Sequence, residues 1–162
     1  MFTVNFIIIN YNKMRNTKIV GAGIIAMHFE GPNTRILLVR GKQSGKWSFP
    51  KGHAEPNEDI IQTGIREMKE ETGIEIQENQ IDKRIKLGEY TFFLVRFYNL
   101  ERVVKQESEV IESSWMLLED VMSLDINEVN YPLKLFRFFI HKNQTIIKFL
   151  KQNRQKVYVM EP

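Results

Sequence analysis

The sequence predicts a single α/β domain in which helices cover a β-sheet. Its 162 residues suit one domain with a sizeable core. Short β-branched runs alternate with helical patterns, and no repeat, low-complexity segment or linker interrupts the chain. We therefore expect residues 17–162 to fold as one unit, with residues 1–16 as an N-terminal extension or an extra strand.

Four strands are predicted from β-branched and aromatic runs bounded by turn signals. Residues 18–27 (KIVGAGIIAM) predict a buried strand and residues 35–40 (RILLVR) a second one. Between them, residues 31–33 (GPN) predict a turn. Residues 85–98, which contain the run YTFFLVRFY, and residues 110–118 predict the other two strands.

The first helix is predicted in the middle of the chain. Asn57 is the expected N-cap, with Glu58 and Asp59 in the first turn. Gly73 is the expected residue that ends the helix. The predicted buried stripe consists of Ile60, Ile61, Gly64, Ile65 and Met68.

The C-terminal segment is predicted to be helical and basic. A short helical turn is expected at residues 118–122, then a helix from residue 130 or 131 to about residue 152, which Asn143 and Gln144 can divide in two. Residues 129–160 contain no acidic residue but seven lysines and arginines. This pattern indicates either a solvated basic helix face or a surface for a polyanion such as RNA.

Composition excludes several classes of protein. The chain has no cysteine, so it has no disulfide framework, thiolate metal site or cysteine nucleophile. The apolar run at residues 6–9 is far too short to span a bilayer and lacks the basic flank of a signal peptide. We therefore expect a cytoplasmic protein with no membrane partner.

The most informative stretch is residues 52–74, GHAEPNEDIIQTGIREMKEETGI. Glu67, Glu70 and Glu71 stand at i, i+3 and i+4, so they share one helix face. Like charges this close repel one another, and a hard divalent cation with oxygen ligands would compensate them. The alternative is an acidic face exposed to solvent.

This stretch resembles the Nudix box, G-x5-E-x7-R-E-U-x-E-E-x-G-U with U apolar, at every defined position. The resemblance implies an α/β/α sandwich around a mixed β-sheet. It also implies hydrolysis of a nucleoside diphosphate linked to another group, with Mg2+ as cofactor and Mn2+ as a substitute. The seven matching residues with fixed identity are Gly52, Glu58, Arg66, Glu67, Glu70, Glu71 and Gly73.

The resemblance also assigns roles within the box. It implies that Glu67, Glu70 and Glu71 ligate the metal, together with the backbone carbonyl of Lys51. Arg66 is expected to orient these glutamates, and it lies two helical turns after Glu58, so the two can pair. Gly52 would let the backbone approach the metal closely.

A fourth carboxylate is expected outside the box. Glu109 lies six residues before Trp115 (EVIESSW), and in several Nudix branches a glutamate at this spacing ligates metal or acts as general base. Glu112 is the alternative at this site. The base that activates water stays open between Glu109, Glu70 and Glu67.

Substrate clues lie beside the box. The run W-x-x-P-K-G-H-x-E-P is similar to the Nudix branch that cleaves dinucleoside polyphosphates such as diadenosine tetraphosphate. Lys51 and His53 are expected to contact a long phosphate chain. Tyr90 and Phe92 share one face of a strand, with Phe93 on the other; they would either stack a nucleobase or pack in the core.

Three alternatives stay open. The Phe-Pro-Lys-Gly element and the basic tail are also similar to mRNA-decapping Nudix enzymes, for which RNA would be the partner. Diphosphoinositol polyphosphate hydrolysis is a second alternative. A non-catalytic module that binds a nucleotide or RNA is the third, although such domains typically lose box glutamates that this chain retains.

Overall fold

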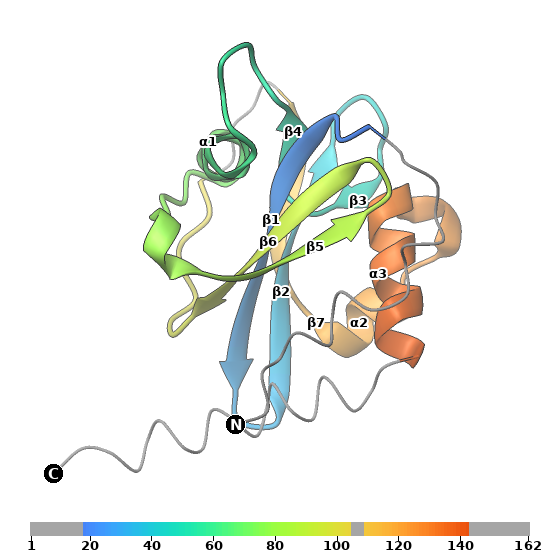
Figure 1. The fold of residues 1–162 in the computed structure, drawn as a ribbon. Helices are drawn as coiled ribbons and strands as arrows, with labels where there is room; N and C mark the ends of the chain where they lie inside the picture. The colour runs from blue at the N-terminus through green and yellow to red at the C-terminus, as the bar shows by residue number, and fades with distance from the viewer. Residues whose placement is uncertain (1–17, 105–108, 143–162) are drawn as a thin grey trace, which may run out of the picture.

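The computed structural model describes residues 18–104 and 109–142 (Figure 1). The predictions for residues 1–16 and for the chain beyond Lys142, including Asn143 and Gln144, lie outside the described residues. The helices are α1 (Ile60–Thr72), α2 (Leu118–Ser123) and α3 (Tyr131–Lys142). The strands are β1 (Gly21–Glu30), β2 (Asn33–Gly41), β3 (Trp47–Ser48), β4 (Lys51–His53), β5 (Ile81–Leu87), β6 (Tyr90–Phe97) and β7 (Val110–Leu117).

The described residues form three layers around one mixed sheet, as expected for an α/β/α sandwich. Helix α1 lies on one face of the sheet, and α2 and α3 lie on the other (Figure 1). Strand β1 is parallel to β6, whereas the other strand pairs are antiparallel. Within the described ranges, every helix is too short or too polar to cross a membrane.

The centre of the sheet splits to admit the segment that precedes the box. Strand β1 pairs with β2 from Met27 to Glu30, but with β4 from Gly21 to Gly23. Strand β2 in turn pairs with β3 at Val39 and Arg40. Strands β1 and β2 therefore diverge away from their hairpin turn, and β3 and β4 fill the space between them.

The strand prediction at residues 85–98 is wrong in one respect, because the structure contains a hairpin there. Strands β5 and β6 are joined by a turn in which Gly88 has a φ of 66°, a left-handed conformation that glycine adopts readily. Strand β5 was missed because its sequence, IDKRIKL, is rich in charge. Its alternating burial is the period-two signal of a strand with one solvent-exposed face.

The start of α1 also differs from the prediction. Asp59, not Asn57, is the N-cap, and its Oδ1 accepts hydrogen bonds from the backbone N–H groups of Ile61 and Gln62, each at 2.9 Å. Asn57 instead adopts a left-handed turn with φ 66°. The helix begins later because Asp59 is the side chain that satisfies its free N–H groups.

The other end of α1 matches the prediction. Gly73 has a φ of 74°, and its N–H donates to the carbonyl of Lys69 at 2.8 Å. Gly64 and Met68 are buried as expected, but the three isoleucines of the predicted stripe are only partly buried. Compared with the predicted stripe, the buried face of α1 is rotated toward Glu67, so that it includes a carboxylate.

Phe49 connects the split in the sheet to the helical layer. It is fully buried, and its ring contacts Phe92 of β6 at 5.3 Å and Phe136 of α3 at 5.1 Å between ring centroids, in edge-to-face geometry. The neighbouring Trp47 is also in the core, at 6% exposure. These two aromatic side chains anchor residues 47–53 in the hydrophobic core beneath the helices α2 and α3.

We predict that Phe49→Ala lowers the free energy of unfolding by about 3–5 kcal/mol. Removing the ring would leave a cavity between the sheet and α3, two layers that cannot easily collapse into it. The melting temperature should fall on the order of 10 °C. Phe138→Ala is the matched control, since that ring is 51% exposed. Equal melting temperatures for the two variants would contradict this role of Phe49.

Candidate active site

The box glutamates of α1 lie against β4 at the split in the sheet. Glu67 is buried, Glu71 is half-buried, and the Glu70 side chain is 56% exposed. The backbone N–H of Lys51 donates to Glu71 Oε2 at 3.1 Å. A Cβ at Gly52 would overlap the carboxylate of Glu67, so this position requires glycine for close approach of strand and helix.

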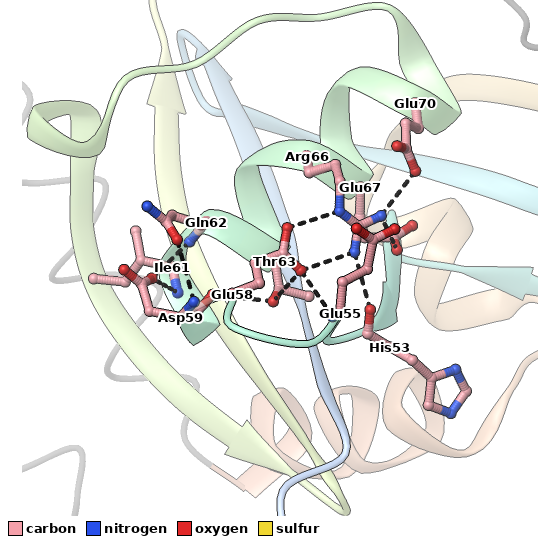
Figure 2. A network of polar contacts seen from close by, with 10 residues as sticks. All are labelled: His53, Glu55, Glu58, Asp59, Ile61, Gln62, Thr63, Arg66, Glu67 and Glu70. Carbon is pink, nitrogen blue, oxygen red and sulfur yellow. Dashed lines mark hydrogen bonds and ion pairs between the residues drawn. The ribbon is translucent and has the colours of Figure 1, made fainter.

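Arg66 is the centre of the polar network (Figure 2). Its Nε and Nη2 donate to the two oxygens of Glu58, at 2.8 and 3.0 Å, which is a bidentate pair. Its Nη1 donates to Glu67 at 2.8 Å and to Glu70 at 2.9 Å. Its Nη2 also donates to the backbone carbonyl of His53 at 2.9 Å. The expected Arg66–Glu58 pair is therefore present, and it joins the loop before α1 to the helix.

Both carboxylate oxygens of Glu58 accept hydrogen bonds. Besides the two contacts with Arg66, Glu58 accepts from the backbone N–H of Glu55 at 3.0 Å and from the Thr63 hydroxyl at 2.9 Å. The hydrogen bonds from Arg66, followed by those from Glu55 and Thr63, lower the pKa of Glu58 to about 2. Glu58 thus holds its charge in a structural network.

Glu71 is in the opposite electrostatic situation. Burial, together with the negative charges of Glu67 and Glu109, raises the pKa of Glu71 to about 8, despite the hydrogen bond from the Lys51 N–H. Burial is also the largest cause that raises the pKa of Glu67, and Glu70 and Glu109 add to it. An ionised Glu71 is therefore unfavourable in this site unless a cation comes close to its carboxylate.

Glu109 comes from a different part of the sheet, at the start of the strand that pairs with β2. It directly precedes β7, and its backbone carbonyl accepts from the N–H of Lys42 at 2.8 Å. The pairing of β2 with β7 shifts register between Arg40 and Gly41 beside it, and such irregularities redirect side chains near functional sites. Its charge acts on both Glu67 and Glu71. The predicted fourth carboxylate therefore lies close enough to the box for its charge to act on two of the glutamates.

The donor set fits a divalent metal ion in charge and in ligand type. Carboxylate oxygens are the ligands that Mg2+ prefers, and the raised pKa of Glu71 reflects a need for positive charge. In the arrangement shown, Glu67 and Glu70 are bound by Arg66. Among the described residues no group of three acidic, histidine or cysteine side chains is already set to hold a metal. The ligands would have to exchange some of their contacts with Arg66 for the ion.

The predicted substrate-binding residues lie in different environments, some at the surface and one in the core. The Nζ of Lys51 lies 4.4 Å from the ring centroid of Tyr90, and the exposed His53 ring lies 6.0 Å from that of Tyr90. Tyr90 is half-buried, and burial raises the pKa of its hydroxyl. Phe92, in contrast, is fully buried against Phe49, so it is a core residue and cannot stack a nucleobase. Phe93 packs on the other face of the sheet, as the alternation predicted.

The backbone contacts of this site could not be predicted from the sequence. The His53 carbonyl binds Arg66, and the Lys51 N–H binds Glu71. Backbone groups are the same in every residue, so no residue type marks them. The contacts follow from the position of β4 beside α1, which only long-range strand pairing decides.

Comparisons with known proteins identify the family. The family model described as NUDIX domain matches residues 17–136. The chain therefore belongs to the Nudix hydrolase family.

Two relatives and two solved structures show the range of similar proteins. The mRNA-decapping enzyme subunit 2 of Saccharomyces cerevisiae is 33% identical over 119 residues, which are 64% of this chain but 12% of that protein's length. The asymmetrical bis(5'-nucleosyl)-tetraphosphatase of Mus musculus is 32% identical over 101 residues, or 55% of this chain and 67% of the mouse protein. An Ap4A hydrolase from C. elegans matches with a TM-score of 0.55 and 25% identity, over 76% of this chain and 99% of its own. A Nudix hydrolase from M. smegmatis shares the fold, with a TM-score of 0.64, 18% identity, and coverage of 80% of this chain and 88% of its own.

We predict that Glu58→Gln lowers the free energy of unfolding by about 1–3 kcal/mol near neutral pH, because it breaks the bidentate pair with Arg66. The folded pKa of Glu58, about 2, lies below the ordinary value of 4.5, so its contribution is complete above about pH 5 and is lost as pH falls toward about 2. Denaturant titrations of both proteins at several pH values measure the difference.

The control for this measurement is Glu78→Gln, which replaces an exposed glutamate. It should lower stability by less than about 0.5 kcal/mol at every pH. A stability difference for Glu58→Gln that stays constant down to pH 2 would show that the carboxylate charge is not what stabilises the network.

Proposed function

We propose that this chain is a Mg2+-dependent pyrophosphohydrolase. It cleaves a phosphoanhydride bond in a nucleoside diphosphate linked to another moiety, and the substrate is a dinucleoside polyphosphate such as diadenosine tetraphosphate. The observation that carries the proposal is the cluster of Glu67, Glu71 and Glu109, in which burial and mutual repulsion raise the pKa of Glu67 and Glu71, with the ammonium group of Lys51 beside it. Such a site suits a cation and a polyphosphate together.

The residues divide the work by position. Glu67, Glu70, Glu71 and the Lys51 carbonyl would hold the metal. When bound, it neutralises phosphate charge and lowers the pKa of water. Arg66 orients Glu67 and Glu70 through its Nη1. Of the three candidate bases, Glu67 and Glu70 are both engaged by Arg66, which favours Glu109 as the group that accepts the proton of the attacking water.

The dinucleoside polyphosphate assignment is supported by the segment before the box. The Lys51 side chain is half-buried beside the cluster, where burial lowers the pKa of its amine while Glu71 and Glu67 act in the opposite direction. A compact cation in this position suits a phosphate chain. The mouse and C. elegans relatives, whose names describe hydrolysis of such dinucleotides, support the same reading.

Capped mRNA is the second candidate substrate. The yeast decapping subunit is similar over 119 residues, and α3 carries Lys134, Arg137 and Lys142 on the acid-free segment. One of these side chains binds within the protein itself, because Arg137 Nη2 donates to the backbone carbonyl of Met122 at 2.8 Å. This leaves a smaller basic surface on the described part of α3 than the sequence implied.

A side-by-side hydrolysis assay separates these functions. The panel contains diadenosine tetraphosphate, capped RNA, ADP-ribose, nucleoside triphosphates and diphosphoinositol phosphates, each with and without Mg2+. We expect the highest kcat/KM for diadenosine tetraphosphate. A preference for capped RNA, with binding that weakens steeply as salt rises, would favour decapping. Nucleotide binding without any turnover would indicate a non-catalytic module.

We predict that Glu71→Gln reduces Mg2+-dependent turnover by at least about 100-fold. Mutating a residue that only hydrogen-bonds a metal ligand typically lowers activity by about 10- to 100-fold, and loss of a direct ligand should lower it more. The fold should survive, since the glutamine oxygen can still accept from the Lys51 N–H. Circular dichroism and a substrate assay measure both properties. Glu75→Gln is the control, because Glu75 is exposed and pairs with Lys69. A folded Glu71→Gln protein with normal turnover would remove Glu71 from the metal site.

We predict that Lys51→Met lowers kcat/KM for diadenosine tetraphosphate by about 10- to 100-fold, the loss expected for a hydrogen bond to a charged group. The variant keeps the aliphatic stem and removes the charge. The loss for ADP-ribose, whose phosphate bridge is shorter, should be smaller. Lys142→Met, at the exposed end of α3, is the control. Equal losses for both substrates would contradict the polyphosphate assignment.

A further inference from the structure

Strand β1 carries two glycines, Gly21 and Gly23, at the point where β4 and β6 flank it. On one side, Gly21 pairs with His53 and Gly23 with Lys51. On the other side, Gly21 pairs with Tyr90 and Gly23 with Phe92. Residues paired directly across a sheet share a face, so these glycines lie between two rows of large side chains.

The two glycines are required for space. A Cβ at Gly21 would overlap the Gly52 carbonyl and lie 2.9 Å from Cε1 of Tyr90. A Cβ at Gly23 would overlap the Pro50 carbonyl and lie 2.6 Å from Cβ of Lys51. Neither glycine has a positive φ, so the reason is not backbone conformation. Together the absent side chains leave a slot across β1, which we call the glycine slot.

The glycine slot lets side chains of β4 and β6 meet above β1. The Lys51 ammonium lies 4.4 Å from the centroid of the Tyr90 ring, within the range of a cation–π contact. At its other end, Lys51 is fixed by its N–H bond to Glu71. The lysine is thus held at its backbone by the box and at its head by Tyr90.

We infer that Tyr90 is a positioning residue whose ring, reached through the glycine slot, holds the Lys51 ammonium ready to bind the phosphate chain of the substrate. Tyr90 then does not stack a nucleobase on that ring face, because the ammonium occupies it. A lysine that is already ordered loses less conformational entropy on binding. The inference rests on the proposed function only in taking Lys51 as the phosphate-binding cation.

The test measures binding of inorganic tripolyphosphate and of adenosine to the full chain by calorimetry in the presence of Mg2+. Tyr90→Leu should weaken tripolyphosphate binding by about 3- to 30-fold, the range that cation–π strengths correspond to. Tyr90→Phe, which keeps the ring, should stay within about 2-fold of the unmodified protein. Adenosine binding should be the same in all three proteins.

A double-mutant cycle makes the test specific to this pair. Adding Tyr90→Leu to Lys51→Met should cause no further loss, because the ring acts through the ammonium. Tyr98→Leu, at the residue directly after β6 and 74% exposed, is the matched control and should not change tripolyphosphate binding. Melting curves check the fold, and Tyr90→Met replaces Tyr90→Leu if the leucine variant does not fold.

Four results would overturn the inference: unchanged tripolyphosphate binding in Tyr90→Leu, additive losses in the cycle, a loss of adenosine binding in Tyr90→Leu, or no tripolyphosphate binding by the unmodified protein. The third would make Tyr90 a base-stacking residue. None of these measurements requires turnover. Failure of the proposed function would appear separately, as absence of hydrolysis across the substrate panel.

Discussion

The candidate active site depends on one guanidinium group placed among carboxylates. Arg66 binds Glu58 with two hydrogen bonds, Glu67 and Glu70 with one each, and the His53 carbonyl with a fifth. The planar fork of arginine donors suits this set in a way that a lysine could not. Since these contacts join the loop before α1 to the helix itself, they fix the side of α1 that faces β4. Removing the charge would leave partly buried carboxylates without compensation.

A second constraint comes from the way the sheet opens. Strands β1 and β2 separate, and the segment that enters between them carries Lys51 and Gly52 to the C-terminal half of α1. Glycines then allow contacts that any side chain would block: Gly52 admits the Glu67 carboxylate, while Gly21 and Gly23 admit side chains from β4 and β6. The site is therefore built as much from missing side chains as from present ones.

Glutamates in this site differ in role because they differ in environment. Hydrogen bonds from Arg66 lower the pKa of Glu58 to about 2, whereas burial and neighbouring negative charge raise that of Glu71 to about 8. The first is a structural group that stays charged down to low pH. The second is a carboxylate that gains most from a cation, and divergent pKa values of this kind are typical of functional sites. The charge of Glu109 contributes to the raised pKa of Glu71, although Glu109 lies 38 residues after Glu71 in the chain.

Local patterns in the sequence determined the box helix, its end at Gly73 and the Arg66–Glu58 pair. They also determined that Phe92 and Phe93 lie on opposite faces of the sheet. These features depend on spacings within one helix, the loop directly before it, or one strand. Several features were decided by the tertiary structure alone. They include the burial of Phe92 against Phe49, the division of the predicted strand at residues 85–98 into a hairpin, and the contact of Lys51 with Tyr90 across β1. Each of these results from strand pairing and register between distant segments, which local periodicity does not encode.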